Sequence, residues 1–142
     1  MSPAIPRVND FTIKIATVNG TGSASANTLL MKSIFRSGIP VMGKNYFPSN
    51  IQGLPTWYEI RVSRSGYVAR AGTVDVMVAM NAETYARDAK EVTPGGFLVY
   101  DSTWPRPALL KREDITVFGV PLARLCNNRC AAVWSRRPTH RG

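Results

Sequence analysis

The sequence has few acidic residues, little cysteine and almost no histidine. Its 142 residues include 9 Asp and Glu against 18 Lys and Arg, two cysteines and one histidine. Cys126 and Cys130 are too few and too close together for a disulfide framework. With His140 they fall short of the four ligands that usually hold a structural zinc ion, and two thiols cannot hold an iron–sulfur cluster. We therefore expect no metal site in this chain.

Catalytic residues are scarce for the same reason. His140 is the only histidine, so a Ser-His-Asp or Cys-His arrangement would have no base in the body of the chain. Asp75 lies within an apolar segment. It could have a shifted proton affinity there, or it could be a structural carboxylate held by hydrogen bonds. We expect no catalytic residue in this chain.

Long hydrophobic runs are missing too. No segment approaches the roughly eighteen uninterrupted apolar residues of a membrane span, and the start, MSPAIPRVND, has no apolar run of signal-peptide length. With 44% hydrophobic residues, 142 residues suit one folded domain. We expect a soluble, cytoplasmic domain without a membrane partner.

The positive charge is concentrated near the C-terminus. Of the net charge of +9, five charges come from arginines after residue 123, with no acidic residue among them. The body lacks the interleaved aromatic and basic residues of a nucleic-acid surface. A nucleic-acid partner is therefore the weakest reading, and its affinity would fall steeply with salt and disappear on removal of residues 127–142. Hydrophobic periodicity fails over 127–142, which predicts a basic, disordered tail.

Periodicity in the body predicts alternating strands and helices. We expect strands at 11–18, 41–47, 57–63, 74–80, 97–100 and 115–120, and helices at 23–37, at 82–90 with Asn81 as its cap, and from Pro121 onward. A turn is expected at 94–96. This order predicts an α/β fold, and the helix-free stretch 41–79 predicts an antiparallel or mixed part of the sheet.

A glycine-containing turn joins the first strand to the first helix. Gly20, Thr21, Gly22 and Ser23 lie where backbone amides and the helix dipole favour an anion, so we interpret them as a phosphate-binding candidate. Ser25 replaces the third glycine of the dinucleotide pattern, and residues 36–50 contain no acid to bind a ribose, which argues against NAD. The alternative is a turn that only connects two elements.

Two further features follow the second strand. The polar residues Lys44, Asn45, Ser49 and Asn50 could contact phosphates or a partner subunit, or be ordinary solvated loop residues. The loop 47–57 carries four large apolar side chains, Phe47, Ile51, Leu54 and Trp57. We predict that it is a docking surface; the alternative is that these side chains fold back onto the domain's own core.

Several segments together resemble a known family. The runs VNGTGSASANTLLMKSIFRSGIPVMGKNYFPSNIQGLPTWYEIRVS, GYVAR, VDVMVAMNAETYARD, GGFLVYDSTW and ITVFGVPLARL are similar to the gamma domain at the N-terminus of 2-oxoacid:acceptor (pyruvate/2-oxoglutarate:ferredoxin) oxidoreductase alpha subunits. The resemblance covers about residues 9–125. It implies a Rossmann-like three-layer α/β sandwich with a mixed, mainly parallel sheet, over a domain 9–126 that lies between an N-terminal extension 1–8 and the tail.

The resemblance also implies a function. Such enzymes oxidatively decarboxylate a 2-oxoacid to an acyl-CoA and reduce ferredoxin, using thiamine diphosphate and iron–sulfur clusters in partner domains. We expect this chain to be a component for subunit assembly that could hold coenzyme A at the glycine turn, to be inactive alone, and to contact ferredoxin only indirectly. It could also form a homo-oligomer. The alternative is a stand-alone Rossmann-like module that binds a small ligand or a partner without redox activity.

Overall fold

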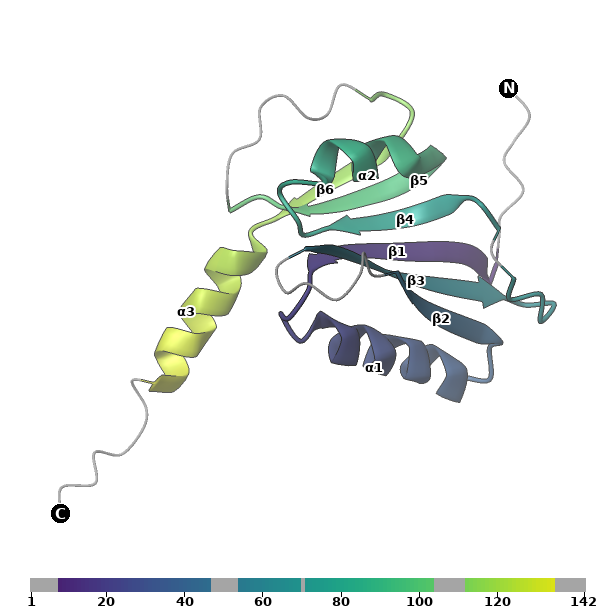
Figure 1. The fold of residues 1–142 in the computed structure, drawn as a ribbon, viewed down its shortest axis with the longest axis horizontal. Helices are drawn as coiled ribbons and strands as arrows, with labels where there is room; N and C mark the ends of the chain where they lie inside the picture. The colour runs from purple at the N-terminus through teal and green to yellow at the C-terminus, as the bar shows by residue number, and fades with distance from the viewer. Residues whose placement is uncertain (1–7, 47–53, 70, 104–111, 135–142) are drawn as a thin grey trace, which may run out of the picture.

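The computed structural model describes residues 8–46, 54–69, 71–103 and 112–134, with the side chains of 129–134 excepted. Six strands form one sheet in the order β2-β3-β1-β4-β5-β6 (Figure 1). Their bounds are β1 Asp10–Val18, β2 Val41–Tyr46, β3 Pro55–Ser63, β4 Val74–Ala79, β5 Val92–Asp101 and β6 Thr116–Val120. The helices are α1 Ser23–Arg36, α2 Tyr85–Glu91 and α3 Leu122–Trp134.

The sheet is mixed, as the sequence predicted. β1, β4, β5 and β6 pair in parallel, whereas β3 pairs antiparallel with both β1 and β2. β2 and β3 are neighbours in the chain and in the sheet, and an antiparallel pair of this kind needs no helical crossover. The helix-free stretch of the sequence therefore corresponds to the antiparallel part of the sheet.

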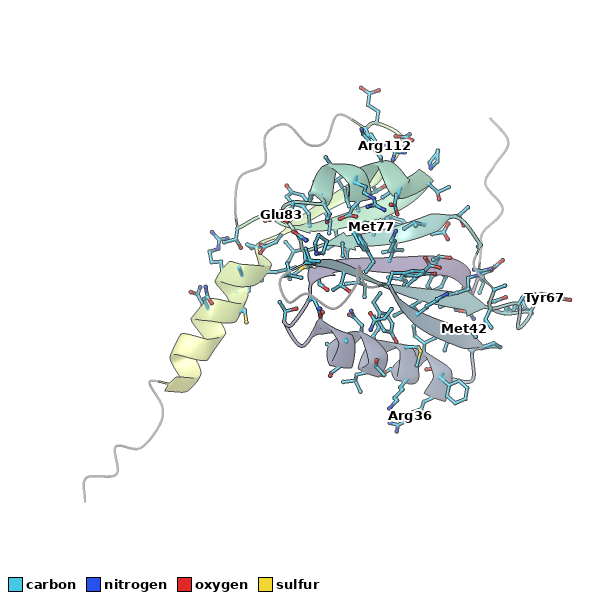
Figure 2. All side chains as sticks on the ribbon, in the orientation of Figure 1. Arg36, Met42, Tyr67, Met77, Glu83 and Arg112 are labelled. Carbon is cyan, nitrogen blue, oxygen red and sulfur yellow. The ribbon has the colours of Figure 1, made fainter. Side chains whose placement is uncertain are left out.

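Helices cover the two faces of the sheet, because successive residues of a strand point to opposite sides. α1 closes one hydrophobic cluster around Ile15, Ile60 and Val62. On the other face, α2 packs Tyr85 and Ala89 against β4 and β5, and the labelled Met77 lies in that layer (Figure 2). The expected three-layer α/β sandwich is confirmed.

The start of α2 differs from the prediction. The helix begins at Tyr85 instead of residue 82, and Thr84 occupies the N-cap position. Asn81 Oδ1 accepts a hydrogen bond of 2.9 Å from the Glu83 backbone N–H, so it closes a turn ahead of the helix instead of capping it. At the other end, Arg112 Nη1 donates to the Ala89 and Val92 carbonyls at 2.9 Å, which satisfies two carbonyls there.

The expected turn at 94–96 is part of strand β5. Gly95 has φ +81°, and the pairing of β4 with β5 shifts register between Val74 and Val76, as at a β-bulge. A Cβ on Gly96 would lie 2.8 Å from the Asp75 carbonyl oxygen, so the strands approach too closely there for a side chain. The Pro-Gly-Gly signal was correct about irregular backbone but wrong about where the strand begins, since β5 starts at Val92 instead of residue 97.

The C-terminal helix also differs from the prediction. Irregular chain was expected from Asn127, whereas α3 continues to Trp134. The division of the chain at residues 8 and 126 stays a prediction. None of the helices in the described ranges is both long enough and apolar enough to cross a bilayer.

Candidate functional site

The glycine turn leaves the start of α1 open. Gly20 and Gly22 have φ of +87° and +75°, and Gly22 is the N-cap, a position from which no side chain caps the helix. Thr21 Oγ1 donates to the Val18 carbonyl at 2.8 Å, which holds the turn in place. The first turn of α1 contains no acidic residue. Uncapped amides at the positive end of a 14-residue helix favour an anion.

A hollow lies along the first turns of the same helix. It has a volume of about 540 Å³ and is lined, among the described residues, by Ala24, Ser25, Thr28, Leu29 and Lys32. Leu29 is 64% exposed and offers an apolar surface, and Lys32 brings a positive charge. The hollow therefore combines hydroxyl, apolar and cationic groups beside the open helix start. Lys32 was missed by the sequence reasoning, although its spacing from Ser25 and Thr28 places all three on one helix face.

Lys44 and Asn45 do not form one cluster. Adjacent residues in β2 face opposite sides of the sheet, so Asn45 shares the side of α1, whereas Lys44 lies on the side of α2. The exposed Lys44 Nζ stands 5.3 Å from the ring centroid of Tyr46. Ser49 and Asn50 lie outside the described residues. The structure thus leaves only Asn45, of the described residues of that group, on the face of the glycine turn.

The loop after β2 is described only from Leu54 onward, so Phe47 and Ile51 lie outside the described residues. The Leu54 carbonyl accepts a 2.9 Å hydrogen bond from the Asn19 backbone N–H, which joins the end of this loop to the glycine turn. Trp57 lies in β3 and packs onto its own domain, where its indole Nε1 donates to Asp88 Oδ1 at 2.8 Å. For Trp57 the alternative reading, packing within the domain, is therefore the correct one.

A buried polar cluster on the α2 side was not predicted. Lys14 and Glu59, neighbours across β1 and β3, are each 6% exposed. Lys14 pairs with Glu91 of α2, and the Arg87 guanidinium lies 4.9 Å from the Trp57 ring centroid. These charged residues line a pocket of about 250 Å³ together with residues 72–74. The signal was present in the sequence as polar residues at alternate positions in part of each strand, namely 10, 12 and 14 in β1 and 59, 61 and 63 in β3.

Asp88 anchors the same cluster from α2. It is fully buried, and its Oδ2 accepts a 2.6 Å hydrogen bond from Thr84 Oγ1. Burial raises the pKa of Asp88, while the hydrogen bonds from Thr84 and Trp57 oppose that shift. Asp75, the other candidate carboxylate, accepts the Thr12 backbone N–H at 2.9 Å. That contact fits the structural reading of Asp75.

Metal ligands do not gather within the described ranges: no three His, Cys, Asp or Glu side chains lie close enough together to hold an ion. Cys126 is exposed on α3.

Comparisons with known proteins agree on one family. The model of the pyruvate ferredoxin/flavodoxin oxidoreductase family matches residues 12–137. The alpha subunit of 2-oxoacid:ferredoxin oxidoreductase 2 from Aeropyrum pernix is 34% identical over 92 residues, which are 65% of this chain and 14% of that protein.

Solved structures of low identity share the fold. A 2-oxoglutarate:ferredoxin oxidoreductase from Magnetococcus marinus, solved with 2-oxoglutarate, coenzyme A and succinyl-CoA bound, matches with a TM-score of 0.75 at 24% identity over 86% of this chain and 22% of that one. A pyruvate oxidoreductase subunit from Thermotoga maritima matches with a TM-score of 0.66 at 16% identity, over 87% of this chain and 68% of that one. The gamma subunit of a keto/oxoacid ferredoxin oxidoreductase from Geobacter sulfurreducens matches with a TM-score of 0.67 at 15% identity, over 84% and 66%.

Proposed function

Because this chain belongs to the pyruvate ferredoxin/flavodoxin oxidoreductase family, we propose that it is a component domain of a 2-oxoacid:ferredoxin oxidoreductase that assembles with thiamine-diphosphate-binding domains and helps to hold coenzyme A. The chain spans only 14% and 22% of two longer relatives. The chemistry of decarboxylation and electron transfer then belongs to partner domains, which would hold the thiamine diphosphate and the iron–sulfur clusters. We propose the cytoplasm as the site of assembly.

The open start of α1 is the observation that carries the coenzyme A proposal. The diphosphate would accept hydrogen bonds from the amides at Gly20, Thr21, Gly22 and Ser23, where no side chain caps the helix. Space is available, since a Cβ on Gly22 would meet nothing within 4 Å. Lys32 would add a charge-assisted contact and Leu29 an apolar one from the hollow. When bound, coenzyme A supplies the thiol that accepts the acyl group.

Binding of coenzyme A to the chain itself tests this proposal. We expect isothermal titration calorimetry to detect binding, and Lys32→Gln to weaken it about fivefold through loss of a charged contact. Lys90→Gln on α2 removes an equal charge away from the hollow and is the matched control. Equal affinities of the wild type and both variants for coenzyme A would show that Lys32 does not contribute to the site. No binding to the wild-type chain would contradict a site built by this domain alone.

Gly22→Val tests the turn separately. The positive φ of Gly22 strains any side chain placed there, so the amides of the turn should move out of alignment. In the assembled enzyme we expect a raised apparent requirement for coenzyme A. An unchanged requirement in a correctly folded variant would leave the turn as a connection between β1 and α1.

The assembly role separates the proposal from a stand-alone ligand-binding module. Co-expression with candidate thiamine-diphosphate-binding subunits should give a stable complex, and the isolated chain with thiamine diphosphate and coenzyme A should reduce no acceptor. Ferredoxin would then be reached only through the partner domains. Failure to co-purify with any such subunit would favour the stand-alone module.

A further inference from the structure

The charged pocket on the α2 side of the sheet lies on the opposite face from α1 and its hollow. Its lining, among the described residues, consists of Lys14 of β1, Glu59 of β3, Arg87 and Glu91 of α2, and residues 72–74 before β4. Its volume is about 250 Å³, which corresponds to about eight water molecules at their share of liquid volume. A small organic molecule fits into that space.

The charges of this pocket belong to buried parts of the sheet. Lys14 and Glu59 are each 6% exposed and lie opposite each other across β1 and β3. Burying two charges costs free energy that an apolar pair would not cost. Towards α1 the same two strands present Ile15 and Ile60 instead. Charge on the α2 side is therefore not needed to form the strand pair, and it indicates a polar occupant of the pocket.

Hydrogen-bonding capacity remains for such an occupant. The Arg87 side chain is 67% exposed, and among the described residues only its Nε has a partner, Glu91 Oε1 at 3.4 Å. Both Nη groups of Arg87 are therefore available to a ligand. A carboxylate can accept about four hydrogen bonds, so Glu59 can accept from a ligand in addition to its contacts within the protein.

The charge balance of the pocket selects the kind of ligand. Lys14 and Arg87 contribute two positive charges, and Glu59 and Glu91 contribute two negative ones, so the described lining is neutral. A ligand with a net charge would leave one buried charge without compensation. An apolar ligand would displace water from four charges and replace none of its hydrogen bonds. A small molecule with one positive and one negative group meets both conditions.

We propose that this pocket binds a small α-amino acid in its zwitterionic form. The ligand carboxylate accepts hydrogen bonds from the Nη groups of Arg87, whose planar guanidinium suits a carboxylate. The ligand ammonium donates to the carboxylate of Glu59, while Lys14 stays paired with Glu91. The site lies on the other face of the sheet from the hollow on α1, so it does not depend on the proposed binding of coenzyme A.

Titration of the isotope-labelled full chain with L-alanine, followed in two-dimensional amide NMR spectra, tests the site. We expect saturable shifts at Gly72, Thr73 and Arg87, with a millimolar dissociation constant because the ligand has few atoms. Pyruvate lacks the ammonium and ethylamine lacks the carboxylate, so each should bind about tenfold more weakly. No shift with L-alanine at about 50 mM, or equal binding of all three probes, would overturn the proposal.

Arg87→Gln tests the carboxylate contact. The variant loses the guanidinium and leaves the pocket with one excess negative charge, so L-alanine should bind about tenfold more weakly and ethylamine should become the preferred probe. Arg36→Gln removes an equal charge from the end of α1 and is the matched control (Figure 2). An affinity for L-alanine in Arg87→Gln equal to that of the control would contradict the assigned contact.

Glu59→Gln shifts the charge balance the other way. It keeps the shape of the side chain and leaves one excess positive charge, so pyruvate should bind more tightly than L-alanine. Because Arg87 is exposed, Arg87→Gln still decides the test if Glu59→Gln does not fold. If both variants fold and neither changes the order of preference among the three probes, the charges only hold the sheet and α2 together and the proposal is wrong.

Discussion

In strands β1 and β3, alternate residues face two different environments. Towards α1 they present Ile13, Ile15 and Ile60, which close an apolar cluster beneath the helix. Towards α2 the residues between them include Lys14 and Glu59, which are equally buried but charged. The first face gains stability from area removed from water. The second must offset the cost of burying charge through ion pairs and hydrogen bonds.

Truncation on the apolar face should have the largest effect. Ile60 is completely buried, so Ile60→Ala leaves a cavity under α1 and should lower the free energy of unfolding by about 3–4 kcal/mol. Urea denaturation measures this loss. Leu29→Ala, on the exposed side of the same helix, is the control and should change little. If Ile60→Ala lowered the free energy of unfolding by less than the variants on the α2 side do, the apolar face would not be the more stabilising of the two.

Breaking the ion pair on the polar face should cost less. Lys14→Met removes the cation in closest contact with Glu91, which keeps only the more exposed Arg87 at 3.4 Å. Because Glu91 is 29% exposed, the expected loss is about 2 kcal/mol. The double variant Lys14→Met, Glu91→Met should recover much of it, since two apolar groups need no partner. A double-mutant cycle by urea denaturation separates these outcomes. Simple additivity would show that the pair is not coupled.

Removing the carboxylate of Asp101, which caps the start of α3, should have a smaller, local effect on stability. Burial alone would raise the pKa of Asp101. Hydrogen bonds from Thr103 and from the backbone of residues 122 and 123 outweigh burial and lower this pKa. Its contribution is therefore present above the unfolded pKa and lost as pH falls through the lower folded pKa. Asp101→Ala should cost about 1 kcal/mol at neutral pH and nothing in strong acid. Circular dichroism measured at neutral and at acid pH checks both expectations, with Glu113→Ala, at an exposed carboxylate away from α3, as the control.

Replacing Asp88 should change stability least, and the pH dependence that Asp88 contributes should have the opposite sign to that of Asp101. The pKa of Asp88 is raised, so the folded state holds a proton more tightly than the unfolded state, and stability falls as pH rises from the unfolded towards the folded pKa. Asp88→Asn keeps an acceptor for the Trp57 indole and should flatten this slope, with a change below about 1 kcal/mol. Thermal unfolding at several pH values measures the slope. An unchanged slope would assign it to another group.

The strands and the first helix could be predicted from periodicity, because their buried residues recur at the regular spacing of a strand or of a helix. The bulge at Gly95 and Gly96 did not, since a Pro-Gly-Gly run looks the same in a turn and in an irregular strand. The start of α2 was placed too early because Asn81 closes a turn as readily as it caps a helix.

The candidate site was partly visible in the sequence. The glycine turn stood out because its residue types are unusual, whereas the Lys14–Glu91 pair joins residues 77 positions apart that only the pairing of the strands and α2 brings together. Lys44 and Asn45 seemed to form one group because they are adjacent in sequence. In a strand, that adjacency places them on opposite faces.

The hydrogen bond from Asn19 to the Leu54 carbonyl joins the turn before α1 to the chain entering β3. A molecule that binds and restricts one of these two segments would also restrict the other. The second segment would then lose less conformational entropy when it binds its own partner. Thermodynamic linkage then makes the effect reciprocal: a partner that fixes the segment before β3 would tighten anion binding at the turn, and the anion would tighten the partner by the same factor. In the proposed function, this backbone hydrogen bond would link the free energy of anion binding at the turn to that of assembly.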